Sequence, residues 1–235
     1  METKTRNFNN PYYPYEKVQI GYNTLKGAEL IPQKLLTYLL DLPDKYGYEP
    51  VDDNDRARVR FIKYLYYDEA NPLAKPLPTR EQKLSLLYDG SNPAITTEED
   101  KRRHPKGYRL FGQNYTKPTE VSANTIVKCY MGRIIPRDDY KTMLGIVFEI
   151  VTNYALIDSV KTTVANRNYA IMQCIVEALH GVDLTGIGTV YFSKPAHGDS
   201  GMTLYHDEGD SSYVTLFMAI EWRESEYPNN VVQDW

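Results

Sequence analysis

The chain has 235 residues, of which 42% are hydrophobic and 25% are charged, and this composition favours a folded soluble protein over a disordered one. Its 2 cysteines, Cys129 and Cys174, are too few for a disulfide scaffold or a cysteine-based zinc site, so we expect both to be buried hydrophobes. The polar opening METKTRNFNN does not have the pattern of a secretory signal, and no apolar run is long enough to cross a bilayer. We therefore expect an intracellular protein without a membrane contact.

Tyrosine is the unusual residue of this chain, with 21 Tyr against 6 Phe and 2 Trp. Its ring buries a large apolar area while its hydroxyl needs a partner, so tyrosine accumulates on surfaces that become half-buried in contacts. Thirteen of the 21 lie in residues 1–123, among the expected arms, loops and helix faces. This distribution predicts an interface-rich protein whose contacts concentrate in its first half.

Residues 1–25 predict an extended arm. They have no apolar periodicity, and Pro11 and Pro14 favour extended backbone. Two interpretations remain open: a frayed terminus, or an arm whose aromatic rings dock on a neighbouring subunit. The tyrosines of this stretch are Tyr12, Tyr13, Tyr15 and Tyr22.

Residues 26–123 predict a region of helices and loops. Apolar residues at helical spacing indicate three helices, over residues 33–41, over 56–68 with Asp53 and Asp55 available as N-caps, and over 80–88.

A basic cluster lies in the polar, proline-rich stretch 89–123. Such a cluster is typical of nucleic-acid contacts, and a nucleic-acid-binding module remains an alternative for this protein. Because Glu98, Glu99 and Asp100 precede the cluster, a solvated loop that compensates its own charge is the favoured interpretation. The residues that would contact DNA or other ions are Lys101, Arg102, Arg103, Lys106 and Arg109.

The apolar pattern changes at residue 124, where alternation replaces helical spacing. The expected elements are strands over 125–135 and 144–157, a helix over 166–180, and strands over 188–193, 202–206 and 213–222. This β-β-α-β-β-β order predicts an α+β fold in which one helix packs on an antiparallel sheet.

The formal charge changes at the same place. Residues 1–123 carry 19 Lys+Arg and 17 Asp+Glu, and residues 124–235 carry the remaining 8 and 14, so the balance goes from +2 to −6. We therefore divide the chain into an extended arm (1–25), a helical and loop-rich region (26–123) and an α+β domain (124–235).

Motifs for catalysis are few. The tetrapeptide GDSG at 198–201 matches the sequence around a serine-protease nucleophile, but a one-helix sheet is not that fold, so a hairpin turn is the favoured interpretation. His197 and Asp199 have the spacing of a His-x-Asp metal-binding pair, and His206 follows them. A metal-dependent enzyme that uses these three residues remains an alternative. The favoured expectation is a protein without enzymatic activity or a cofactor.

The second half resembles tail-completion and tail-terminator proteins of tailed bacteriophages. Over about residues 124–225 the matching pattern is two long strands, one amphipathic helix ending in glycine (NRNYAIMQCIVEALHG), and a hairpin (YFSKPAHGDSGM) followed by a long final strand. The first half, with PLPTREQKLSLLYDG and EEDKRRHPKGYRLFGQNY, is similar to neck proteins of the crAss-like phage type. Simple tail terminators are about as long as the second half alone, so residues 1–123 are an addition to that pattern.

This resemblance implies a structural protein of the virion that is assembled in the host cytoplasm. Copies would form a closed ring of six or twelve in the head-to-tail connector, or neck, where they join portal to tail and let DNA pass. The negative balance of the second half suits such a lumen, because like charge repels DNA. The implied partners are further copies of the chain, the portal, and other neck or tail proteins. The tyrosines expected at these contacts are Tyr12, Tyr13, Tyr15, Tyr22, Tyr66, Tyr67, Tyr108 and Tyr115.

Overall fold

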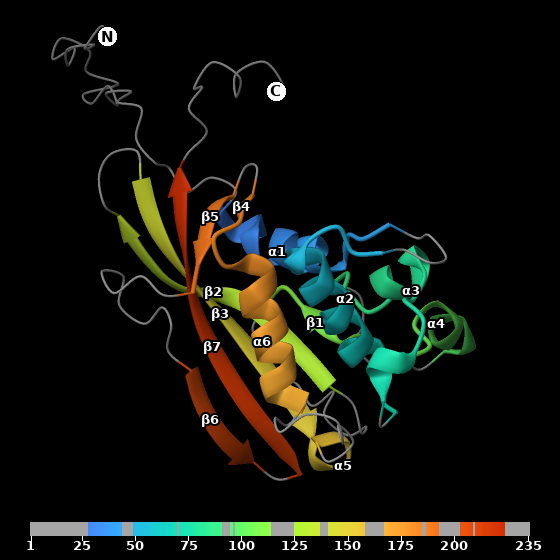
Figure 1. Ribbon diagram of the computed structural model, residues 1–235. Coiled ribbons are helices and arrows are strands. Elements are labelled where there is room, and N and C mark those ends of the chain that lie inside the picture. The colour runs from blue at the N-terminus through green and yellow to red at the C-terminus, as the bar shows by residue number, and fades with distance from the viewer. Residues whose placement is uncertain are drawn as a thin grey trace, which may run out of the picture.

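The fold has a curled sheet and a layer of helices that covers one of its faces (Figure 1). α6 packs on the sheet, and α2 packs against α6 from the helical first half. The computed structural model describes residues 28–43, 49–69, 71–90, 95, 97–113, 125–136, 141–157, 167–184, 187–192, 203–208 and 210–223.

The helices of the first half follow their apolar spacing and their caps. The helices predicted over 33–41 and 56–68 are confirmed as α1 and α2, with shifted ends. Asp52, one residue before the predicted caps, is the N-cap of α2, and its side chain accepts a hydrogen bond from the Asp55 N–H at 2.8 Å. The bounds are η1 (Ala28–Leu30), α1 (Ile31–Leu40), α2 (Asp53–Tyr66), η2 (Pro72–Ala74), α3 (Arg80–Leu84) and α4 (Glu98–Arg103).

α3 is shorter than the helix predicted over 80–88. Thr79 and Gln82 form the capping box that starts it. At the other end, the N–H of Tyr88 donates to the carbonyl of Leu110 at 2.8 Å, so pairing with the sheet replaces the last helical turn.

The sheet is mixed and has the strand order β1-β2-β3-β7-β5-β4, with β6 also paired to β7. β1 runs parallel to β2, and every other pair is antiparallel. β7 pairs with β3 along its whole length, while its other side pairs first with β6 and then with β5. The predicted α+β class is confirmed, and the predicted strands and helix follow one another as expected, but the short helix α5 before α6 and the two-residue strand β4 after it were not predicted. The bounds are β1 (Leu110–Phe111), β2 (Thr125–Pro136), β3 (Lys141–Asn153), β4 (Asp183–Leu184), β5 (Gly188–Tyr191), β6 (Thr203–Glu208) and β7 (Ser211–Arg223).

The second strand of this domain is the element whose prediction was least accurate. It was expected over 144–157, but β3 begins at Lys141 and ends at Asn153. The last residues instead form the short helix α5 (Tyr154–Ile157). The N–H of Tyr154 donates to the carbonyl of Asp210 at 2.9 Å, so α5 starts where the chain contacts the β6–β7 turn.

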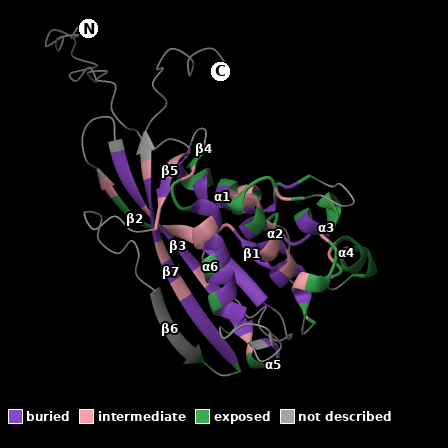
Figure 2. Cartoon of the chain, in the orientation of Figure 1, coloured by how far each residue is buried: buried purple, intermediate pink, exposed green. Residues whose placement is uncertain are grey.

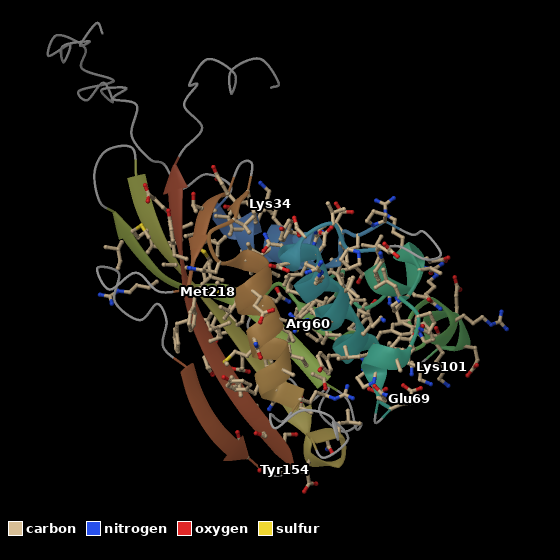
Figure 3. All side chains as sticks on the ribbon, in the orientation of Figure 1. Lys34, Arg60, Glu69, Lys101, Tyr154 and Met218 are labelled. Atoms are coloured by element: carbon tan, nitrogen blue, oxygen red, sulfur yellow. The ribbon has the colours of Figure 1, made fainter. Side chains whose placement is uncertain are left out.

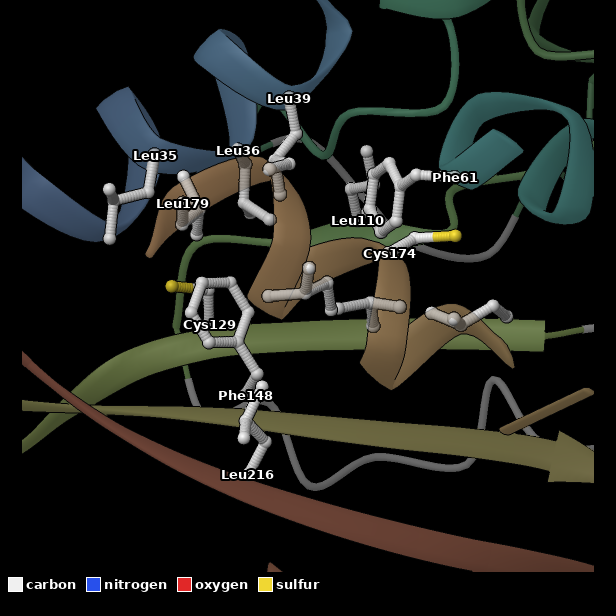
Figure 4. Packing of buried hydrophobic residues seen from close by; sticks show 14 of the residues in the cluster. Leu35, Leu36, Leu39, Phe61, Leu110, Cys129, Phe148, Cys174, Leu179 and Leu216 are labelled. Carbon is white, nitrogen blue, oxygen red and sulfur yellow. The ribbon is translucent and has the colours of Figure 1, made fainter. Parts of the chain in front are cut away.

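One hydrophobic core joins both halves of the chain. α6 (Arg167–Leu179) confirms the helix predicted over 166–180, and its buried face lies between α1, α2 and the inward side chains of β2, β3 and β7. Buried residues accordingly run along the middle strands and α6 (Figure 2). The change at residue 124 is thus a change of secondary structure within one core. Figure 4 labels core members from both halves: Leu35, Leu36, Leu39, Phe61, Leu110, Cys129, Phe148, Cys174, Leu179 and Leu216.

A second, smaller cluster covers the opposite face of the sheet near β1. It brings Tyr108 and Phe111 onto one row of the sheet, formed by Ile126, Val151 and Tyr213. The segment around β1 therefore protects this end of the sheet on the side that α6 does not reach.

A buried arginine at the start of α6 holds the end of α2. The Arg167 side chain is fully buried, and its guanidinium donates to the carbonyls of Tyr64 at 2.7 Å, Tyr67 at 2.8 Å and Glu69 at 3.2 Å. These carbonyls lie at the carboxyl end of α2, where a positive charge is favourable. Burial lowers the pKa of Arg167, and the nearby charge of Asp68 opposes that shift. The contact joins the helical half to the sheet domain.

Candidate subunit interface

The far half of β2 forms an open edge of the sheet. β1 pairs with β2 only at Val127 and Lys128, and no described strand pairs with residues 131–135 on the side away from β3. Figure 1 shows this part of β2 at the border of the sheet. Arg133 is exposed, and Ile134 keeps 44% of its surface in contact with solvent. Unpaired N–H and C=O groups on such an edge are a template for an added strand. We call residues 131–135 the β2 edge.

A β-bulge shapes the β2 edge. The pairing register of β2 with β3 shifts between Met131 and Arg133, which makes Gly132 the extra residue. A Cβ atom at Gly132 would lie 2.6 Å from a methyl carbon of Val147, and one at Gly145 would lie 3.2 Å from the Cβ of Arg133. Glycine is therefore required at 132 for steric reasons, and the bulge bends the strand at this point.

A shallow apolar hollow lies beside the bulge. Its volume is about 160 Å³, and Met143, Phe217 and Ala219 line it together with both glycines. The hollow is on the sheet face away from α6. On that face, next to the hollow, Lys128 and Glu149 form a cross-strand ion pair at 2.6 Å, with side chains that are 10% and 18% exposed. Burial raises the pKa of Tyr130 on the neighbouring row, and the Glu149 charge adds to that shift. The surface next to the β2 edge is therefore apolar, and its ion pair leaves no net charge.

β6 forms a second open edge and has the opposite charge. It pairs with β7 on one side, and no described strand pairs with it on the other. Its sequence TLYHDE contains Asp207 and Glu208 but no Lys or Arg, and Glu208 is exposed. Asp210, in the turn that follows, is exposed as well.

The predicted basic cluster is mostly a short helix with internal ion pairs. The expected loop around Lys101 is α4, and Thr97 is its N-cap. Lys101 lies 2.7 Å from Glu98, and Arg103 pairs with Glu99 one turn away. Figure 3 shows Lys101 on the side of the molecule away from Met218 of β7. The expected compensation of charge is therefore present, although within a helix.

Arg109 is not available for a contact with DNA, and that prediction is wrong. Only 2% of its surface is exposed, and its guanidinium binds both carboxylate oxygens of Asp68 at 2.7 and 2.8 Å. It also donates to the carbonyl of Leu65. Lys106 lies 3.7 Å from the same carboxylate, with its side chain 31% exposed. The sequence could not indicate this, because the partner acid lies far away along the chain.

The described tyrosines expected at contacts are mainly part of the chain's own fold. Tyr66 and Tyr108 are 7% and 6% exposed, so the prediction that they lie on a contact surface is wrong. The Tyr108 hydroxyl lies 3.1 Å from Nε2 of His104. Tyr67 is half-buried and donates to the carbonyl of Pro76 at 3.0 Å. Each of these rings has contacts within the chain: Tyr66 lies on the buried face of α2, Tyr67 follows its last residue, and Tyr108 packs on the sheet.

Several predicted site residues lie outside the described residues, so their predicted roles stay predictions. The arm and loop tyrosines among them are Tyr12, Tyr13, Tyr15, Tyr22 and Tyr115, and the residues of the alternative metal-dependent enzyme among them are His197 and Asp199. His206 belongs to β6, opposite Tyr213, but its side chain is not described.

Sequence reasoning missed the most exposed described tyrosines. Tyr154 and Tyr169 are 41% and 43% exposed, at the start of α5 and near the start of α6. Figure 3 shows Tyr154 at the end of the molecule where β6 and β7 meet. It also missed the β2 edge, for which the only signal was the pattern Gly-Arg-Ile-Ile at the end of a strand.

The two thiols are buried, as expected. Cys129 is fully covered, and burial raises the pKa of Cys174 to about 12, so neither is poised as a nucleophile. Among the residues that the structure describes, no group of three or more His, Cys, Asp or Glu side chains is arranged to hold a metal ion. In the same residues, no helix is long and apolar enough to span a membrane.

Comparison with known proteins gives one match. The family model YomW matches residues 59–233, a segment that runs from α2 through β7. No curated protein and no solved structure matches. Because the matched segment covers more than half of the 235 residues, this chain belongs to the YomW family.

Proposed function

We propose that this protein is a structural component of a phage virion that assembles into a ring in the head-to-tail connector. The observation that carries the proposal is the β2 edge, an exposed stretch with a surface isoleucine, and no described strand pairs with its outer side. Soluble monomers usually protect such edges, because an open edge invites pairing with another chain. A protein that assembles with copies of itself has a use for this edge.

The architecture supports the same proposal. The sequence resemblance to tail-completion proteins rests on the order β-β-α-β-β-β, and the structure has these elements in this order, with the short α5 and the two-residue β4 in addition. A single core holds the helical half against this domain, so α1, α2 and the sheet form one unit. In a ring, such a unit would serve as the repeating block.

The charge distribution fits the passage of DNA without retention. Residues 124–235 carry a balance of −6, and the described cations outside that segment are largely paired within the chain. A negatively charged lumen repels the phosphate backbone and lets it slide. The portal and the neighbouring neck or tail proteins would bind the two rims of the ring.

The test is assembly. Purified full-length protein at tens of micromolar should form closed rings of six or twelve copies in negative-stain images, and it should bind the portal or neck proteins encoded beside it. A particle that stays strictly monomeric and binds none of them would refute the proposal.

A further inference from the structure

The geometry points to strand addition between unlike edges: β6 of one copy pairs with the β2 edge of the next, and continues its sheet. This inference rests on the proposed ring and names the surfaces that would form it.

Both strands have the backbone groups that such pairing needs. The β2 edge is followed only by Pro136 before the strand ends, and β6 has 6 residues with one side unpaired among the described strands. An added strand can therefore pair along most of either edge. It would also cover Ile134, which is 44% exposed although the residue opposite it, Leu144, is fully buried.

Charge selects unlike edges over like ones. The β2 edge carries Arg133 and no acid, whereas β6 carries two acids and no Lys or Arg. Pairing two copies of β6 would put like charges together, and so would pairing two β2 edges. Pairing β2 with β6 places Arg133 near an acidic strand.

The charged side chains also stand on the same face of the sheet. Arg133 is opposite Gly145, and Glu208 is opposite Ser211. Gly145 and Ser211 both alternate with inward-facing core residues, so these two charges lie on the face away from α6. If the face away from α6 stays on the same side of the continued sheet in both copies, Arg133 and Glu208 can therefore meet across the new strand pair.

The pairing of unlike edges has a consequence for assembly. Like edges would meet about a two-fold axis and stop at a dimer. Unlike edges leave one free edge of each kind after every addition, so addition continues until the ring closes. The pairing therefore produces the kind of oligomer that the proposed function requires.

Cysteine cross-linking of the full-length chain tests the inference. Positions 133 and 208 lie on the same face of the sheet, so the variant R133C/E208C should give a ladder of covalent oligomers with a short bismaleimide. R133C alone and E208C alone should remain monomeric on a denaturing gel. The native thiols are 0% and 2% exposed and should not react. The matched control is V51C/E208C, because Val51 is 84% exposed but precedes α2, away from both edges.

Charge reversal gives an independent measurement. R133E should weaken self-association about ten-fold, and R133E/E208K should restore most of it. Covalent dimers from either single cysteine variant would show that like edges meet and would overturn the inference. If the wild type forms rings but the double-cysteine variant gives no ladder, the inference is overturned and the ring itself stands. A wild type that is monomeric at tens of micromolar would refute the ring itself.

Discussion

Replacing Arg167 by methionine tests how the two halves of the chain are held together. Methionine keeps most of the apolar stem but removes the guanidinium. The carbonyls of Tyr64, Tyr67 and Glu69 would then lose a charged donor at the end of α2.

The magnitude follows from these three contacts. Hydrogen bonds to a charged group contribute about 1.5 kcal/mol or more each, so the gross loss is about 4–5 kcal/mol. Removing a fully buried cation also removes its desolvation cost, and the lowered pKa of Arg167 shows that this cost exists. We expect a net loss of about 3 kcal/mol in the free energy of unfolding, or about 6–12 °C in Tm.

Urea unfolding followed by circular dichroism measures this loss. The matched control is Arg56→Met on α2, whose side chain is 63% exposed and pairs with Asp53 one turn away. That variant should lose less than about 0.5 kcal/mol. If Arg167→Met costs less than about 1 kcal/mol, or no more than the control, the guanidinium does not hold the end of α2.

Three further predictions concern the bulge, alkaline pH and α4. Gly132→Ala should lower the free energy of unfolding by about 1–3 kcal/mol, because the added methyl group would clash with Val147. In a chain that also carries Val147→Ala, most of that loss should disappear. An equal loss with valine and with alanine at 147 would contradict the clash. Burial raises the pKa of Cys174 and of several tyrosines, so the folded chain holds these protons more tightly than the unfolded chain does. The contribution of these groups to the free energy of unfolding should be complete below pH 9 and be lost as the pH rises through 9–12. The lowered pKa of Lys63 acts in the opposite sense. A flat stability profile up to pH 12 would refute this. Replacing Arg102 and Arg103 by glutamine should leave any weak retention on DNA nearly unchanged at physiological salt; a loss of tight, steeply salt-dependent binding would support the nucleic-acid alternative.

Much of the fold could be predicted from local pattern. Every second residue of β7 from Val214 to Ile220 belongs to the main core, and α6 repeats its buried residues at helical spacing, so both elements could be recognised from sequence alone. The N-cap signal placed the start of α3 at the correct residue, whereas α2 starts three residues before the predicted Arg56, with Asp52 as its cap. These features depend on neighbours in the chain, which a sequence displays directly.

What failed depends on partners distant in sequence. Arg109 belongs to a run of basic residues, yet its side chain is buried and paired with Asp68. The sequence around Tyr108 is typical of an exposed loop, but its ring packs on strands that come later in the sequence. The β2 edge could not be predicted either, because whether a strand lies at a border depends on where β1 stops pairing. That one core continues across residue 124 could not be predicted for the same reason, because it depends on the contact between α2 and α6, which are far apart in the sequence.

Sedimentation velocity of the full-length wild type at tens of micromolar tests the central claim most directly. A ring predicts a single fast-moving species whose mass is six or twelve times the 27.1 kDa of one chain. A species of 27.1 kDa alone at that concentration would contradict it.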